Sequence, residues 1–173
     1  ARVELFEGVD DGLPQDLAKA LGLYQTAADH GNVNAMHNLA VLLSQGVNAP
    51  PDPALALKWF QSAANYGLRD SQYNLGVMYA RGIGTAVDLP QSFKWFAIAA
   101  KAGDADAGAR RDEVATSMSA AEIAQAQAAV AAWRVKQPII EANAVRQPAG
   151  GWDADVVNDV DRQALVKTIQ TLL

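Results

Sequence analysis

The amino-acid sequence repeats itself at an interval of 36 residues, and no insertion is needed to align the copies. Each copy carries a tryptophan–phenylalanine pair, an alanine pair and a glycine. These landmarks fall at Trp59, Phe60, Ala63, Ala64 and Gly67, and again at Trp95, Phe96, Ala99, Ala100 and Gly103. A period of this length is typical of stacked supersecondary units, because one unit alone cannot bury its apolar face. The repeat therefore favours a binding scaffold over an enzyme.

Each copy divides into two predicted helices. Helix A is expected over about residues 34–45 and 70–81, where apolar residues recur along one helix face. Helix B is expected to begin near Asp52 or Asp88, because an aspartate there can cap the free N–H groups of the first turn, and to run to the landmark glycine. The glycines that follow the two A helices as stop signals are Gly46 and Gly82.

Degraded copies flank the two clear ones. An earlier copy places Gly31 over Gly67, and its helix A is shortened to about residues 3–7. Later in the chain, residues 106–117 still predict a helix A, and a long alanine-rich helix is expected from Ala120 to about Lys136. Ser119 and Glu122 form a capping box at its start. A polar final repeat is what the open end of a solenoid requires.

These patterns predict an all-α, superhelical solenoid of helix pairs, followed by an extended segment and a terminal helix. Prolines and glycines break the helical pattern near residues 138–152, and we expect this segment to lie across the solenoid with Ile139 and Ile140 as an anchor. Trp152 either anchors the segment or is an exposed contact for a partner. The predicted parts are repeats at roughly 1–31, 34–67 and 70–103, a capping pair at 106–136, a Pro/Gly linker at 137–152 and a helix at 153–173.

Composition narrows the possible functions. The chain contains no cysteine, which excludes disulfides, thiolate metal sites and cysteine catalysis. Its formal net charge of −5 disfavours a general nucleic-acid role. No apolar stretch is long enough to span a membrane, and the first residues show no basic region followed by an apolar region, so we expect no signal peptide in this sequence. Because it starts abruptly and ends on an apolar helical pattern, we expect it to be a fragment of a longer protein.

The pattern Asn-Leu-Gly-x-Met-Tyr-x-x-Gly-x-Gly at residues 74–84 resembles the Sel1-like repeat. The Asp88 position, the Lys94-Trp95-Phe96 run and the later alanine pair and glycine resemble it too, and the similarity covers roughly residues 14–135. This resemblance implies an α/α superhelix related in shape to tetratricopeptide arrays, which assembles other proteins, often at the bacterial envelope. It implies no cofactor. Some Sel1-like proteins bind cell-wall fragments, but that group is rich in cysteine.

The tail carries a second resemblance. The apolar positions Val166, Ile169, Leu172 and Leu173 look like the opening helix of a peptidoglycan-binding domain, which would be truncated here. Repeats, linker and helix together are similar to the periplasmic region of PodJ-type polar-organising proteins. This resemblance implies a periplasmic scaffold that helps to place polar structures. The alternative is a cell-wall peptidoglycan binder that recognises glycan or muropeptide.

The second face of the A helices is the predicted partner-binding surface. Its amides can bond the backbone of an extended peptide, and its valines can contact peptide side chains. The alternative is a solvated helix face. In helical-pair solenoids the A helices usually line the concave surface. The candidate residues are Asn34, Asn38, Val41, Gln45, Asp70, Asn74, Val77, Arg81 and Arg110.

Other polar residues receive structural interpretations. Lys58 and Lys94 occupy equivalent positions, where they either meet acidic partners or cover an aromatic ring with their stems. The two histidines, His30 and His37, could bind zinc or act as acid and base, but their repeat equivalents are tyrosine and alanine, so we expect them only to fill repeat positions.

Patterns typical of catalytic or ion sites are incomplete. A glycine pair at Gly82 and Gly84 is a fragment of a phosphate loop, but no strand precedes it. The aspartates from Asp153 to Asp161 lack the glycine and distal glutamate of a calcium loop. No convincing Ser/His/Asp set is present. We therefore expect no catalytic, cofactor or metal site.

Overall fold

The computed structural model describes residues 12–46 and 49–144, and every regular element among them is a helix. The chain divides into two compact units, residues 1–143 and 144–173, and the described fold belongs to the first. The predicted all-α class is therefore confirmed. Four predicted features lie outside the described residues: the short helix near residues 3–7, the second half of the linker (145–152), Trp152 within it and the terminal helix at 153–173.

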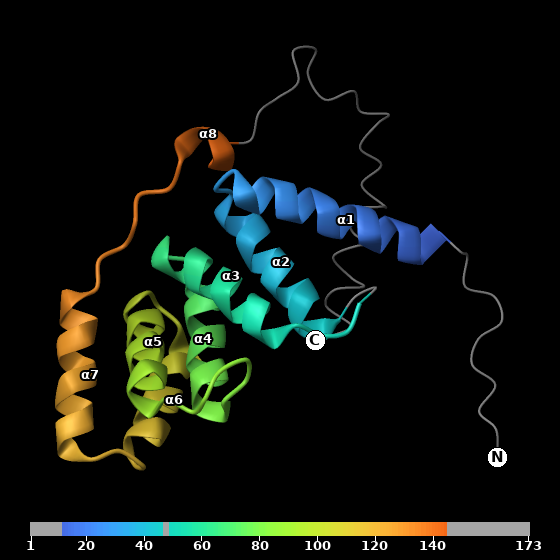
Figure 1. The fold of residues 1–173 in the computed structure, drawn as a ribbon. Coiled ribbons are helices and arrows are strands. Elements are labelled where there is room, and N and C mark those ends of the chain that lie inside the picture. Colours follow the sequence, from blue (N-terminus) through green and yellow to red (C-terminus); the bar gives the residue numbers. More distant parts are fainter. Residues whose placement is uncertain (1–11, 47–48, 145–173) are drawn as a thin grey trace, which may run out of the picture. The chain divides into compact units, whose positions relative to one another are not determined.

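Eight helices follow one another along the described chain (Figure 1). Consecutive helices pack together from α1 to α6, and α7 returns to pack on α5. Thus α1 serves as the B helix of the first copy, while α2 with α3 and α4 with α5 form the two clear repeats. The helices are α1 (Gly12–Asp29), α2 (Val33–Gln45), α3 (Pro53–Asn65), α4 (Arg69–Arg81), α5 (Leu89–Lys101), α6 (Ala105–Ala115), α7 (Ala120–Ala132) and α8 (Ile140–Asn143).

The predicted start and stop signals are confirmed. Asp52 Oδ1 accepts the backbone N–H of Leu55 at 2.9 Å, and Asp88 caps the start of α5 in the same way at 3.0 Å. The capping box at the start of α7 is present, with both of its reciprocal hydrogen bonds. Gly46 and Gly82 end α2 and α4 in the left-handed conformation. These local signals fix the helix lengths, so the repeats stay in register.

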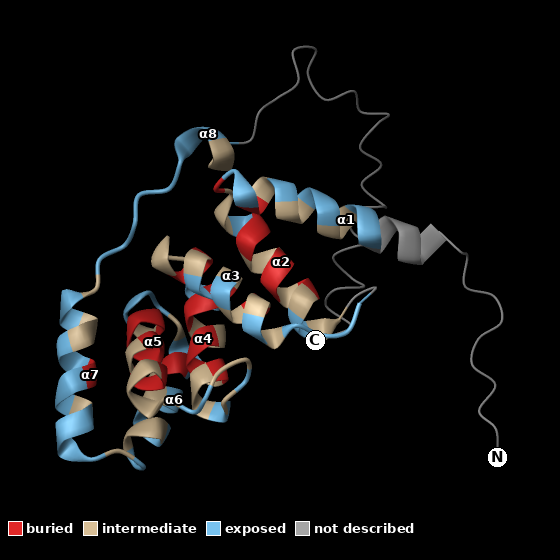
Figure 2. Cartoon of the chain, viewed as in Figure 1, coloured by how far each residue is buried: buried red, intermediate tan, exposed pale blue. Residues whose placement is uncertain are grey.

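The core is built mainly from the B helices and the facing A-helix stripes. Figure 2 shows buried residues above all on α2, α4 and α5, while α7 turns most of its surface to solvent. Phe60 and Phe96 are buried, and the alanine pairs beside them let neighbouring helices approach closely. The repeated tryptophans differ: Trp95 is only 1% exposed, whereas Trp59 is partly buried at the edge of the core.

Helix α7 ends at Ala132, four residues before the predicted end at Lys136. Trp133 adopts an extended conformation while its N–H still bonds Ala129 O. Three residues after Trp133 the chain is tied to the end of α3, because Lys136 N donates to Asn65 O at 2.8 Å. Tertiary contacts therefore override the helical preference of the alanine-rich sequence.

Residues 133–143, named the strap here, run back along the repeats from α7 to the α1–α2 turn (Figure 1). Val135 packs where a Cβ on Gly67 would lie, and Ile139 packs in the same way at Gly31. Asn143 then bonds Gly31 O and Val33 N at 3.0 and 2.8 Å. The predicted anchor is thus Ile139, but not its neighbour Ile140, which is 77% exposed.

Gly84 docks the α4–α5 loop against the preceding repeat. It has a positive φ of 71°, and a Cβ on it would overlap the carbonyl oxygen of Pro53, at the start of α3. Only glycine meets both demands without strain. The glycines at residues 82 and 84 are therefore explained by helix termination and loop packing.

We predict that Gly84→Ala destabilises the fold by about 2–5 kcal/mol, from the left-handed conformation and the overlap together. Gly103→Ala shares the positive φ but meets nothing within 4 Å, so it should cost only about 1–2 kcal/mol. Gly22→Ala, inside α1 and also unobstructed, should stabilise by about 1 kcal/mol. Urea unfolding of the three variants measures the series, and equal effects at Gly84 and Gly103 would contradict the docking contact.

Candidate functional site

A groove of about 320 Å³ opens between the A helices α4 and α6. Phe96, from the intervening helix α5, is buried below it, and the edge of the Tyr73 ring meets the Phe96 ring with centroids 5.4 Å apart. Val77 and Val114 pack on the same cluster. The apolar floor is therefore held by the repeat packing itself. We call this feature the α4–α6 groove.

Two arginines and one glutamate, Glu113, line the α4–α6 groove, which leaves it with one excess positive charge. Arg81 and Arg110 both line it and are exposed. Arg110 Nη1 lies 2.9 Å from Glu113 Oε2, and hydrogen bonding to Glu113, together with the nearby Tyr73, raises the pKa of Arg110. The Arg110–Glu113 pair is well exposed, so it orients the side chains more than it stabilises the fold. Arg81 forms no ion pair with another described residue.

Three of the nine predicted residues, Val77, Arg81 and Arg110, meet in this groove. Asp70 and Asn74 lie on α4 outside the groove lining, and Asp70 instead makes a loose 3.6 Å ion pair with Arg69. The other four are on α2, away from this groove. Of these, Asn34 is exposed and Val41 packs against the core cluster, while Asn38 and Gln45 are partly buried.

Sequence reasoning missed the aromatic part of the groove. Tyr73 lies one helical turn before Val77, so the i, i+4 spacing could have placed it on the same face. Phe96, a landmark residue of the repeat, is buried in the core and also forms the floor of the groove. No sequence pattern shows that a core residue also borders an opening.

Both histidines have structural roles. His37 Nδ1 lies 2.8 Å from Ser71 Oγ, and the His37 ring meets Phe60 edge-on at 5.4 Å. His30 is exposed and bonds Thr26 O at the end of α1. Within residues 12–46 and 49–144, no three histidine, cysteine or acidic side chains are grouped closely enough to hold a metal ion.

The two equivalent lysines differ in their surroundings. Lys94 Nζ lies 4.7 Å from the centre of the Trp95 ring, and burial lowers the pKa of Lys94. Lys94 therefore covers an aromatic ring, which is one of the two alternatives predicted for it. Lys58 is exposed. The described helices include none that combines the length and apolar character needed to cross a bilayer.

Comparison with known families identifies the repeat. The family model described as the Sel1 repeat matches residues 3–32, 33–67 and 69–104. This chain belongs to the Sel1 repeat family. Proteins built from Sel1 repeats generally act as scaffolds for protein–protein interaction, and their fold is typically non-catalytic. No curated protein matches the chain significantly.

Solved structures share the fold. One is c5321, a protective antigen of uropathogenic Escherichia coli strains that displays an SLR fold, with 27% identity and a TM-score of 0.64 over 75% of this chain. Another is a Sel1 repeat protein from Oxalobacter formigenes, with 38% identity and a TM-score of 0.52 over 56%. This chain covers 30% and 29% of those two chains. A PodJ-type origin finds no support in these comparisons.

We predict that His37 makes stability depend on pH. Burial lowers the pKa of His37 from its ordinary 6.5 and outweighs Asp70, which raises it. Below about pH 6.5 the unfolded chain therefore binds a proton that the folded chain does not. This contribution is present above pH 6.5 and is lost as the pH falls toward the folded pKa.

Chemical unfolding at several pH values between about 7 and 5 tests this linkage. The free energy of unfolding should fall with pH in the wild type and fall less in His37→Asn. The matched control is His30→Asn, which changes the exposed histidine and should keep the wild-type slope. Identical slopes in all three proteins would refute the assignment to His37.

Proposed function

We propose that this chain is a non-catalytic scaffold that docks an extended segment of a partner protein in the α4–α6 groove. The observation that carries the proposal is the pairing of an apolar floor at Phe96, Val77 and Val114 with the cations Arg81 and Arg110. This arrangement suits a segment that places an apolar side chain on the floor and an acidic side chain beside the arginines.

The location of the groove supports this mode of binding. Its walls are two A helices, and polar residues on the same face of α2 and α4 extend the surface beyond the groove itself. Asn38 and Asn74 occupy equivalent positions one repeat apart. Their amides provide both donors and acceptors for a peptide backbone. An extended segment could therefore continue from the groove along the earlier repeat.

A peptide selection tests the proposal. Peptides selected from a random library on the folded chain should combine acidic and apolar residues. The double variant Arg81→Glu with Arg110→Glu should weaken their binding at least about tenfold, or about 1.4 kcal/mol, by reversing the charge of the groove. Arg69→Glu, on α4 but outside the groove, is the matched control and should bind as the wild type does. Unchanged binding by the double variant would rule out this groove.

We also propose that the scaffold works in the periplasm of the bacterial envelope and helps to assemble polar structures, with peptidoglycan binding as the alternative function. These proposals rest on the resemblances of the sequence. The tail residues that carry the peptidoglycan resemblance lie beyond residue 144, outside the described residues. The protein-docking function is the one favoured by the described side chains.

Co-sedimentation with isolated peptidoglycan sacculi separates the two functions. If the repeats only dock protein, residues 1–173 should stay in the supernatant. Washed sacculi sedimented without protein provide the blank. The double variant of the α4–α6 groove should sediment to the same extent as the wild type. Pelleting of residues 1–173 would favour the peptidoglycan alternative.

A further inference from the structure

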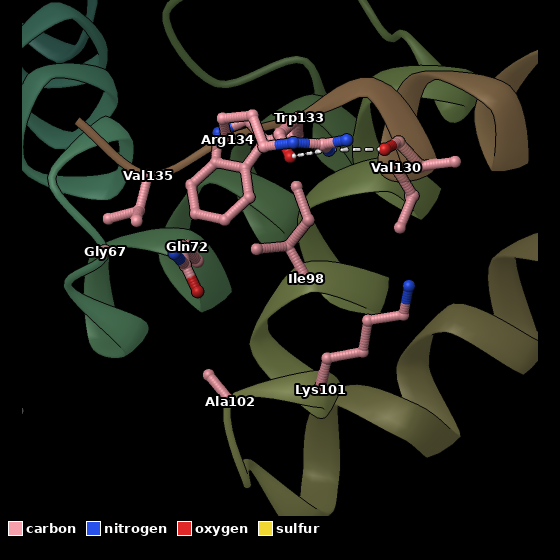
Figure 3. Close-up of a pocket in the computed structure, with 10 residues that line it drawn as sticks. Gly67, Gln72, Ile98, Lys101, Ala102, Val130, Trp133, Arg134 and Val135 are labelled. Carbon is pink, nitrogen blue, oxygen red and sulfur yellow. Dashed lines mark hydrogen bonds between the residues drawn. The ribbon is translucent and has the colours of Figure 1, made fainter.

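A second cavity, of about 460 Å³, opens where the strap leaves α7. Its walls come from α4, α5, α7 and the strap, and it shares no lining residue with the α4–α6 groove. In Figure 3 the Trp133 ring, the Ile98 side chain and the Gln72 carboxamide border the same opening, and Lys101 projects along one side. The volume lies in the range of about 300–1,000 Å³ that is usual for ligand sites.

Gln72 places a hydrogen-bond acceptor without a partner in this wall. The residue is only 1% exposed, and its Nε2 donates to Ala64 O at 3.2 Å, which fixes the orientation of the carboxamide. Its Oε1 is buried and has no partner. Because buried polar atoms in folded proteins almost always find a partner, this oxygen indicates a missing N–H or O–H donor.

The charged groups around the cavity are both cationic. Lys101 and Arg134 line it, and no acidic side chain does, although the whole chain has a net charge of −5. Arg134 Nη1 donates to the carbonyls of Ala131 and Trp133 at 2.6 and 2.8 Å, so the guanidinium is held in place. Neither cation forms an ion pair with another described residue. The cavity therefore favours an anion.

The remaining wall is apolar. Ile98, Val130 and the Trp133 ring give the cavity a hydrophobic side next to its two cations. A ligand that fits must join an apolar group, an N–H donor and a negative charge within a few bonds of one another. The last residue of a polypeptide has this combination, because its backbone N–H and terminal carboxylate flank one side chain.

We propose that this cavity binds the carboxyl terminus of a peptide whose last side chain is apolar. The terminal carboxylate pairs with Lys101 and Arg134, and the last backbone N–H donates to Gln72 Oε1. The apolar side chain packs on Ile98, Val130 and Trp133. This site is independent of the α4–α6 groove and gives the scaffold a second contact with a different kind of peptide.

The direct test uses the tripeptide acetyl-Ala-Ala-Leu with a free carboxylate, beside the same tripeptide ending in a carboxamide. Each is titrated into the isotope-labelled chain and followed by NMR. The free acid should shift the indole N–H of Trp133 and the backbone N–H of Lys136, which bonds Asn65 O within the strap. The carboxamide should bind at least about tenfold more weakly, because it lacks the charge. The variant Trp133→Phe assigns the indole signal.

Variants locate the binding. Lys101→Gln should weaken binding of the free acid about tenfold, whereas Lys58→Gln, an exposed lysine on α3 outside the cavity, should not change it. Ala102→Phe should abolish binding, because Ala102 is exposed at the cavity and a larger side chain fills it. The groove variant with Arg81→Glu and Arg110→Glu should bind as the wild type does, which separates this site from the groove.

Three results would overturn the proposal. The first is the absence of any shift with the free acid up to about 10 mM, which would leave Gln72 Oε1 to a buried water. The second is equal affinity for the acid and the carboxamide. The third is a set of shifts confined to residues away from the cavity. Circular dichroism of every variant shows whether a loss of binding reflects a loss of fold.

Discussion

Packing between neighbouring repeats holds this chain together. The largest buried cluster takes residues from both clear repeats, including Ala40 and Phe60 from one and Leu75 and Trp95 from the next. A second cluster joins α1 to α2 and α3, and the others join α5 to α6 and α7. A single helix pair could not bury such surfaces alone, so the fold exists only as a stack. The α4–α6 groove is one consequence of how two repeats meet.

The strap connects the last helices of the stack to the first ones. A solenoid has two ends and an open side, and its end repeats lack a neighbour on one face. Here α7 covers α5 at one end, and the strap then crosses to the α1–α2 turn, where Asn143 and Asn32 exchange hydrogen bonds with the opposite segment. Two of the three glycines that close repeats, Gly31 and Gly67, leave room for an aliphatic side chain of the strap, whereas Gly103 meets no strap residue. These two glycines thus end helices and receive the strap.

Local signals made the helices predictable from sequence. The 36-residue period is visible in the sequence itself, and the capping aspartates and the capping box act within a few residues, so all three can be recognised without a structure. The predicted end of α7 was wrong. The alanine-rich sequence favours helix through Lys136, but the hydrogen bond from Lys136 to Asn65, about 70 residues away in the sequence, requires an extended chain there. The nine candidate residues share a helix face in the sequence. Only three of the nine, Val77, Arg81 and Arg110, line one groove, because the groove forms between α4 and α6. The cavity at Gln72 had no sequence signal, because its walls come from three helices and the strap.

Differences between equivalent positions of the repeats make the two ends of the A-helix surface distinguishable to a bound segment. Three equivalent A-helix positions carry Asn38, Asn74 and Arg110, so the surface changes from neutral amides to a cation along the stack. Gln45 is likewise followed by Arg81 one repeat later. Because the backbone geometry repeats while the charge does not, an extended segment with one acidic end would bind in a single direction, with that end toward α6. An acidic chain makes this local contrast stronger, since the net charge of −5 repels polyanions while the two arginines attract a single carboxylate at short range. In the proposed docking mode, specificity would therefore reside in the few residues that break the repeat.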